Sequence, residues 1–450
     1  MDAFVIHGGE RLSGRVRAGG SKNASLPLMA AALLTDEPVV LEGVPRLADI
    51  ANMRRLIDEL GCGTTDEPGA HGSMRLSLRC HDESASTARY DIVRTMRASI
   101  CVLGPLLARR GQARVSMPGG CAIGDRPVDL HLRGLRALGA QISLDSGDVV
   151  ARAPRGGRLK GARIFLGGPF GPTVLGTANV MSAAALAEGE TIIESAACEP
   201  EVADLATILN AMGARIRGAG SPRIVIEGVR ELRGARHTVI PDRIEAGTYL
   251  IAGAITRGRI TVENCPIDHL MAAADLLEGI GVRLDVAEGA GDGLRASVTV
   301  ECSGRVKPAQ ITTQPHPGFP TDLQAQVMAL LCMADGNSVI TERIYPQRFL
   351  HVPELARMGA ALFHQGPTVV VSGVRELVGA PVMASDLRAS ASLVLAGLAA
   401  RGKTAVLRVY HLDRGYERME ERLAAMGARI ERVDEKELAG VAAGAAAGGE

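Results

Sequence analysis

An amphipathic helical pattern that ends at a glycine recurs six times along this chain of 450 residues. The six copies read LIDELGC, LRALGAQI, LNAMGARI, LEGIGVRL, LARMGAAL and LAAMGARI. Their glycines lie 68 to 78 residues apart and are Gly61, Gly139, Gly213, Gly281, Gly359 and Gly427. A glycine just after a helix can adopt the left-handed backbone that turns the chain into a strand. The spacing therefore predicts six structural units of about 70 residues each.

A second helical segment, rich in alanine, leucine and valine, recurs within each unit. Examples are LPLMAAALLTDE, ANVMSAAALAEG and LRASASLVLAGLAARG, and a strand-like run such as TIIESAA follows each copy. A helix that is apolar on nearly all sides is typical of a buried position. We predict an α/β fold with two lobes of three units each. Three buried helices should lie inside each lobe, with sheets outside them and functional groups between the lobes.

The charge balance and the aromatic content exclude several classes of protein. Fifty basic residues balance fifty acidic ones, so the chain lacks the net positive field on which nucleic-acid and membrane-surface binding commonly depend. The chain has no tryptophan and few other aromatic residues, which disfavours a platform for stacking bases. The first residues do not resemble a signal peptide, and no apolar run is long enough to span a bilayer. We expect a cytoplasmic protein; the sequence predicts no oligomeric state.

The cysteines and histidines do not form a pattern of metal ligands. The eight cysteines are scattered without a CxxC pair, and most of them read as buried, inert side chains. We therefore predict no metal and no cofactor. The stretch GLAARGKT, residues 397–404, matches the phosphate-loop pattern, but that motif follows a strand and precedes a helix. Here a helical pattern precedes it and a strand-like run follows, so we expect no nucleotide site there.

Charged side chains gather where the buried helices are expected to begin. They lie in SKNAS, RTMRAS, PDRIE, FPTDLQAQ and SDLRASAS, and the residues concerned are Lys22, Asn23, Arg97, Asp242, Arg243, Glu245, Asp322, Asp386 and Arg388. An aspartate in such a place is commonly a helix cap, or a partner for a neighbouring arginine. Cations at this end oppose the helix dipole and need an anion, so they predict a site for phosphate or carboxylate groups. Arg126, Arg348 and Arg414 lie in loops, where each alone is more typical of a surface charge.

A glycine-rich stretch, MPGGCAIGDRP at residues 117–127, cannot be a strand or the interior of a helix. Its cysteine, Cys121, therefore lies on a loop, and the glycines give it no anchor in a core. The nearby Arg126 can stabilise a thiolate. We interpret the loop as a lid that opens for substrates and closes Cys121 over them.

Several long stretches of the sequence resemble those of a known family. The stretches SKNASLPL, YDIVRTMRASI, PDRIEAGTYL, HPGFPTDLQAQ, RFLHVPELARMGA, DLRASASLVLAG and YHLDRGYERMEERLAAMGA, with the cysteine loop, are similar to those of the UDP-N-acetylglucosamine 1-carboxyvinyltransferases. These are enolpyruvyl transferases of peptidoglycan synthesis. The resemblance implies a two-lobed inside-out α/β barrel with six repeats of a two-helix, multi-strand unit. It implies one lobe at 22–236 and a second at 1–21 plus 237–433, and the low-complexity end, 434–450, reads as a frayed tail.

The resemblance also implies a reaction and its residues. The enolpyruvyl group of phosphoenolpyruvate would pass to the 3′-hydroxyl of UDP-N-acetylglucosamine through a tetrahedral ketal, with release of phosphate. Cys121 would be the acid, which also forms a covalent adduct with substrate, and Asp322 the base. Lys22, Asn23, Arg126 and Arg414 would contact phosphoenolpyruvate, and Arg348 and Arg388 would hold its carboxylate. The remaining implied substrate contacts are Arg97, Pro127, Val128, Asp129, Leu130, Asp322, Ile344 and Asp386.

Two alternatives remain beside this interpretation. One is a 5-enolpyruvylshikimate-3-phosphate synthase-like enzyme, which shares the chemistry but lacks the cysteine loop. The other is a catalytically impaired homologue that binds sugar nucleotide. The second draws on a departure from the family at Leu166–Val180, LGGPFGPTVLGTANV, which is longer than the family's VSVGAT turn and lacks its lysine. We expect no nucleotide contacts to carry over there. An RNA-end-processing enzyme is disfavoured by the neutral charge.

Overall fold

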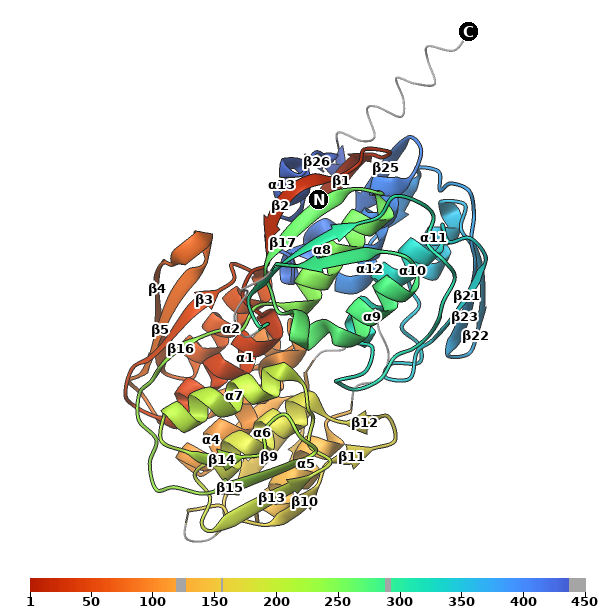
Figure 1. The fold of residues 1–450 in the computed structure, drawn as a ribbon. Coiled ribbons are helices and arrows are strands. Elements are labelled where there is room, and N and C mark those ends of the chain that lie inside the picture. Colours follow the sequence, from red (N-terminus) through yellow and green to blue (C-terminus); the bar gives the residue numbers. More distant parts are fainter. Residues whose placement is uncertain (119–126, 155–156, 288–292, 437–450) are drawn as a thin grey trace.

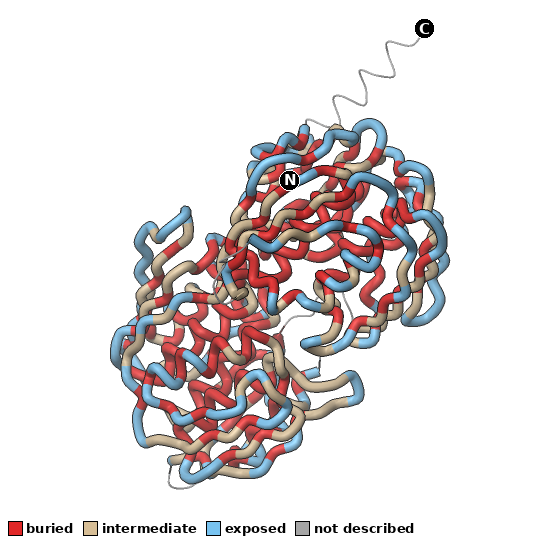
Figure 2. The backbone as a smooth tube through the Cα atoms, viewed as in Figure 1, coloured by how far each residue is buried: buried red, intermediate tan, exposed pale blue. Residues whose placement is uncertain are grey.

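The structure is a computed structural model that describes residues 1–118, 127–154, 157–287 and 293–436. Figure 1 shows two bodies joined at their middle, each with sheets around a group of helices. Their hydrophobic cores are separate clusters. One runs from Ala24 to Val239, and the other combines Phe4–Ala18 with Ile244–Ala428. Figure 2 shows buried backbone at the centre of both bodies and exposed backbone around them.

Six predicted buried helices and six predicted amphipathic helices are present. The largely buried helices are α1 (Lys22–Ala31), α4 (Leu103–Arg110), α6 (Val174–Ala184), α8 (Arg243–Ile255), α10 (Gln324–Leu331) and α12 (Leu387–Ala399). The others are α2 (Ala48–Glu59), α5 (Asp129–Ala137), α7 (Pro200–Ala211), α9 (Met271–Gly279), α11 (Val352–Arg357) and α13 (Met419–Ala425). The six repeat glycines follow this second set, and all adopt φ between 79° and 104°. The glycine prediction is therefore confirmed, because only a left-handed residue turns each helix into its strand.

The strands repeat one pattern. In the described part of the chain they form six four-stranded sheets, in each of which a short edge strand runs parallel to its neighbour and the other pairs are antiparallel. Three sheets belong to the first body: β16 (Arg236–Thr238), β3 (Val39–Val44), β5 (Met74–Cys80), β4 (Cys62–Pro68); β6 (Thr87–Ala88), β7 (Gln112–Ser116), β9 (Asp148–Arg152), β8 (Gln141–Asp145); β10 (Arg163–Phe165), β13 (Glu190–Glu194), β15 (Arg223–Glu227), β14 (Arg215–Arg217).

The second body has the other three sheets: β2 (Ser13–Arg17), β17 (Arg259–Cys265), β19 (Ala296–Glu301), β18 (Arg283–Val286); β20 (Gln310–Thr312), β21 (Asn337–Thr341), β23 (Thr368–Ser372), β22 (Ala361–Gln365); β24 (Pro381–Met383), β25 (Lys403–Leu407), β1 (Asp2–His7), β26 (Arg429–Asp434). In the last sheet β1 lies between β25 and β26, so the first strand of the chain completes the sixth unit. The GLAARGKT stretch joins α12 to β25, a helix before a strand, as its context predicted.

The second unit differs from its prediction. The run from Ile92 to Gly111 reads as one buried helix, but it is divided into α3 (Tyr90–Val93), the 3₁₀ helix η3 (Arg97–Val102) and α4. Gly104 explains the close packing at this break, since a Cβ there would lie 2.3 Å from the carbonyl oxygen of Asn179 on α6. The Asn179 side chain accepts from the Gly104 amide at 2.8 Å and donates to the Ile100 carbonyl at 2.8 Å.

The chain crosses between the two bodies at two neighbouring places. The Ser21 amide donates to the Ile240 carbonyl at 2.7 Å, and the Asp242 amide donates to the Gly19 carbonyl at 2.8 Å. The two crossing segments therefore hold each other by backbone hydrogen bonds. Because α1 and α8 begin directly after them, the first turns of both helices face the junction.

Candidate active site

The first turns of α1 and α8 are joined by hydrogen bonds. Asp242 caps α8 by accepting from the Ile244 and Glu245 amides at 2.9 and 3.0 Å. Its second oxygen accepts from the Lys22 amide at 3.1 Å, across the crossing segments. Asp242 is thus a cap, as the residue type suggested, and it also places the start of α1 against the second body.

Asp322 lies between two arginines at the start of α10. One carboxylate oxygen accepts from Arg348 at 2.7 Å and the other from Arg388 at 3.0 Å. The arginine side chains are 8% and 4% exposed, whereas Asp322 keeps a quarter of its side chain exposed. Burial alone would raise the pKa of Asp322, but the charges of Arg388 and Arg348 hold it well below its ordinary value. The carboxylate is therefore ionised, and it is a weak base while both arginines are in place.

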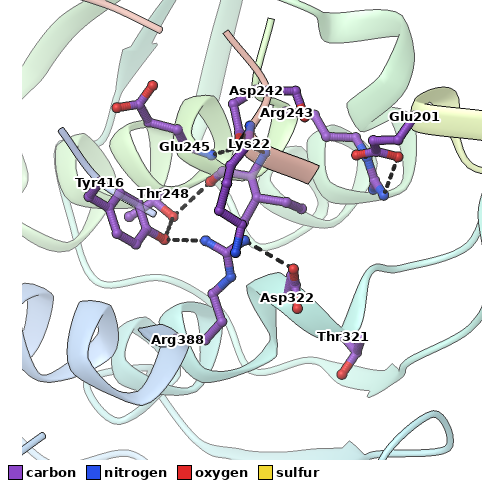
Figure 3. A network of polar contacts seen from close by, with 12 residues as sticks. Lys22, Glu201, Asp242, Arg243, Glu245, Thr248, Thr321, Asp322, Arg388 and Tyr416 are labelled. Carbon is purple, nitrogen blue, oxygen red and sulfur yellow. Dashed lines mark hydrogen bonds and ion pairs between the residues drawn. The ribbon is translucent and has the colours of Figure 1, made fainter. Parts of the chain in front are cut away.

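A buried polar network positions Arg388 from behind (Figure 3). Arg388 donates to the Tyr416 hydroxyl at 3.1 Å, and that hydroxyl lies 2.9 Å from the Thr248 hydroxyl on α8. The Gln326 amide on α10 donates to Tyr416 at 3.2 Å and to the Asp322 carbonyl at 2.9 Å. The network therefore ties together the N-terminal parts of all three buried helices of the second body.

Asp49, near the start of α2, joins two predicted site residues from different bodies. Its oxygens accept from Lys22 Nζ at 3.2 Å and from Arg414 Nε at 2.9 Å. Asp49 is 2% exposed, and although burial raises its pKa, the charges of Lys22 and Arg414 lower it overall. The three side chains thus form a buried carboxylate with two cations beside it. Sequence reasoning missed Asp49, because one aspartate in the first turn of a surface helix reads as an ordinary end charge.

Two other charged residues at the helix starts have partners within the chain. Arg243 donates to Glu201 of α7 at 3.0 Å, and Asp386 caps α12 by accepting from the Arg388 and Ala389 amides at 3.0 and 3.2 Å. The cations at the helix starts were expected to need an anion; Arg243 finds it in Glu201 and Arg388 in Asp322, both within the chain.

A cavity of about 620 Å³ opens between the two bodies, and Glu342 in its lining accepts from Thr321, the neighbour of Asp322, at 2.8 Å. The second body lines it with residues 313–315, with Glu342–Ile344, and with Pro346 and Pro367. The first body lines it with Pro169, Phe170 and Gly171. These belong to the segment Leu166–Val180, which contains the short hairpin of β11 (Gly167–Gly168) and β12 (Gly171–Pro172).

The other predicted residues lie on the first body. Asn23 follows Lys22 in the first turn of α1, and Arg97 begins η3. Val128 precedes α5, with Pro127 before it and Asp129 and Leu130 in its first turn. Cys121 and Arg126 lie outside the described residues. Besides Asp49, sequence reasoning missed Tyr416, Thr248, Gln326 and Glu201. Each contacts a site residue, or a neighbour of one, that lies far away in the sequence.

The described residues contain neither a membrane-spanning helix nor a cluster of metal ligands. None of the helices there combines the length and the apolarity that crossing a membrane requires. Among those same residues, no group of three or more His, Cys, Asp or Glu side chains is placed to hold a metal ion.

The fold and the arginine-rich site define a class of proteins. The model of the family described as EPSP synthase (3-phosphoshikimate 1-carboxyvinyltransferase) matches residues 6–423, so the chain belongs to this enolpyruvyl transferase family. The crystal structure of the enolpyruvyl transferase NikO from Streptomyces tendae is similar, with a TM-score of 0.84 and 28% identity over 96% of this chain and 99% of that one. An EPSP synthase from Acinetobacter baumannii, with a TM-score of 0.74 and 18% identity, shares the fold.

Within that class, the chain groups with the UDP-N-acetylglucosamine 1-carboxyvinyltransferases. It is 55% identical over 432 residues to the protein of that name from Anaeromyxobacter sp. (strain Fw109-5), covering 96% of this chain and 99% of the relative. It is 52% identical over 434 residues to the one from Akkermansia muciniphila, with coverage of 96% and 99%. The resemblance inferred from the motifs is therefore confirmed.

Proposed function

We propose that the protein transfers the enolpyruvyl group of phosphoenolpyruvate to the 3′-hydroxyl of UDP-N-acetylglucosamine, releasing phosphate, as a cytoplasmic step of peptidoglycan synthesis. The observation that carries the proposal is Asp322, held between Arg348 and Arg388 at 2.7 and 3.0 Å, with its neighbour Thr321 bonded to Glu342 in the lining of the cavity between the two bodies. The carboxylate can accept the proton that a substrate hydroxyl must lose. The two buried arginines can bind the carboxylate of the other substrate.

The arginine pair gives the base a means of activation. In the proposed complex, the carboxylate of phosphoenolpyruvate binds Arg348 and Arg388 and replaces Asp322 as their partner. With its partners taken, the pKa of Asp322 rises from its depressed value, and the carboxylate becomes a better acceptor for the proton of the sugar hydroxyl. The base is therefore activated only when phosphoenolpyruvate is bound, which limits proton abstraction from water in place of the sugar hydroxyl.

The phosphate would bind at a second group of cations, one of which, Lys22, also lowers the pKa of Asp322. Asp49 contacts both Lys22 of the first body and Arg414 of the second body. We propose that these two cations bind the phosphate as a clamp, which Asn23 and Arg126 complete. In the addition step, the sugar oxygen bonds to the central carbon of phosphoenolpyruvate and Cys121 gives a proton to the methylene carbon. In the elimination step, that carbon returns a proton to the Cys121 thiolate, and the phosphate leaves with the proton that Asp322 took from the sugar hydroxyl, restoring the double bond.

The cavity is the proposed place for the sugar nucleotide. Ile344 and the Phe170 hairpin line it, and Arg97 and residues 127–130 are proposed to contact the nucleotide from the first body. Asp386 would act through its cap on α12, which positions Arg388. The same proposal includes the two-lobed inside-out barrel, with lobes at 22–236 and at 1–21 plus 237–433.

Release of phosphate from phosphoenolpyruvate, with and without UDP-N-acetylglucosamine, tests the proposal. Release that depends on the sugar nucleotide is the expected result. Release with shikimate 3-phosphate instead would favour the sister activity that the family description names. A folded enzyme that binds the sugar nucleotide but releases no phosphate would identify an impaired homologue.

A further inference from the structure

Cys62 and Cys80 lie directly opposite each other in the antiparallel ladder of β4 and β5. Both are buried, with 0% and 5% of their surfaces exposed, and both are free thiols. Side chains of opposite residues point to the same face of a sheet, and their Cα atoms are about 4.5–5.5 Å apart. That separation lies within the range of about 4.4–6.8 Å that a disulfide spans, so the ladder already holds this pair in register.

The surroundings of the pair lower the pKa of Cys80. The neighbouring thiol raises the pKa of Cys62 and lowers that of Cys80, whose own thiol donates to the Ala32 carbonyl at 3.5 Å. The charge of Arg110 lowers the pKa of Cys80 further. One Arg110 nitrogen donates to the Leu60 and Ala85 carbonyls, while its Nε and Nη2 atoms are buried without a hydrogen-bond partner among the described residues. The guanidinium is therefore oriented by backbone oxygens, and its charge lies near enough to lower the pKa of Cys80.

Three other buried cysteines provide the contrast. Burial raises the pKa of Cys101, Cys265 and Cys332 to about 12, and neither a second thiol nor a cation is among the causes of those shifts. They fit the sequence prediction of inert apolar side chains, whereas Cys62 and Cys80 do not. The thiol pair is thus a separate feature, distinct from ordinary core packing and from the site at the lobe junction.

The pair lies at the end of an edge strand, close to the surface from which an oxidant would reach it. β4 is the edge strand of its sheet, Cys62 is its first residue and Cys80 is the last residue of β5. His81 and Asp82, which follow, are exposed. Figure 1 shows the β4–β5 hairpin at the outer side of its body. Opening the last ladder pair of an edge strand is a local event that needs no unfolding of the core.

We propose that Cys62 and Cys80 form a reversible disulfide, and that this pair is a modification site for peroxides. The Cys80 thiolate attacks one oxygen of the peroxide, giving a sulfenic acid and releasing water after protonation. Cys62 then attacks the Cys80 sulfur as its thiol loses a proton, the sulfur–oxygen bond breaks and a second water leaves. Two thiols and one hydrogen peroxide thus become one disulfide and two waters, and an added dithiol reverses the oxidation by exchange.

Peptide mapping of the full-length folded protein after brief treatment with hydrogen peroxide tests the proposal. Free thiols are then blocked under denaturing conditions. The expected result is a linked peptide pair that contains Cys62 and Cys80, removed by dithiothreitol, while Cys265 is recovered as a blocked thiol. The linked pair should vanish in Cys80→Ser and persist in Cys265→Ser, the matched control from another buried strand. Two outcomes would overturn the proposal: no linked pair in the wild-type protein, or a pair that forms only when urea has unfolded it first.

Discussion

Replacing Asp322 with asparagine tests whether this residue is a base or only a structural partner. Its carboxylate accepts from Arg348 and Arg388 at 2.7 and 3.0 Å, and both guanidinium groups are buried. Asparagine keeps one acceptor oxygen, so one charge-assisted hydrogen bond of about 1.5–3 kcal/mol is lost. Breaking a buried ion pair costs about 3–5 kcal/mol, but a quarter of the Asp322 side chain is exposed, which reduces the penalty. We expect the free energy of unfolding to fall by about 2–4 kcal/mol.

The catalytic effect should be much larger than the structural one. Loss of a general base lowers kcat by about 10²–10⁴-fold, measured as phosphate release at saturating substrates under conditions where the variant is folded. Asp204→Asn is the control, since Asp204 is a 4% exposed carboxylate that pairs with His237 at 2.7 Å outside the site. That variant should lose stability but keep its kcat. A folded Asp322→Asn enzyme with the wild-type kcat would refute the assignment of the base.

Three further predictions follow from the packing and the charges. Asp49→Asn removes the charge that holds two cations, so the KM for phosphoenolpyruvate should rise about tenfold or more; an unchanged KM would contradict the clamp. Gly104→Ala places a Cβ 2.3 Å from a backbone oxygen and should cost about 1–3 kcal/mol in urea unfolding, whereas Gly279→Ala, with nothing within 4 Å, should be neutral or stabilising. Burial raises the pKa of Glu245 from 4.5 to about 7, so the folded state binds a proton that the unfolded state has released. Its contribution to stability is complete below pH 4.5 and is lost as pH rises through 7, and Glu245→Gln should flatten the slope of unfolding free energy in that window. Equal slopes in the two proteins would count against the shifted pKa.

The repeat pattern predicted the fold well because its signals are local. A glycine after an amphipathic helix is forced by backbone geometry, and all six repeat glycines have the left-handed φ that this requires. The break in the second unit was not predictable in the same way. It depends on Gly104 meeting Asn179 of another helix, 75 residues further along the chain.

The site shows the same division. Lys22, Asp322 and Arg388 were found because each stands at the start of a buried helix, a position that the sequence pattern marks. Asp49 was missed because its meaning depends on Arg414, which lies 365 residues away and in the other body. The thiol pair was missed for a similar reason, since only the register of β4 and β5 brings Cys62 opposite Cys80.

The structure of the sugar-nucleotide product is the most direct test of the central claim. UDP-N-acetylglucosamine and phosphoenolpyruvate are incubated with the protein, and the sugar nucleotide is isolated and examined by mass spectrometry and NMR. The account predicts an enolpyruvyl ether at the 3′-oxygen, formed in equal amount with the released phosphate. Recovery of unmodified sugar nucleotide, or an ether at another hydroxyl, would contradict it.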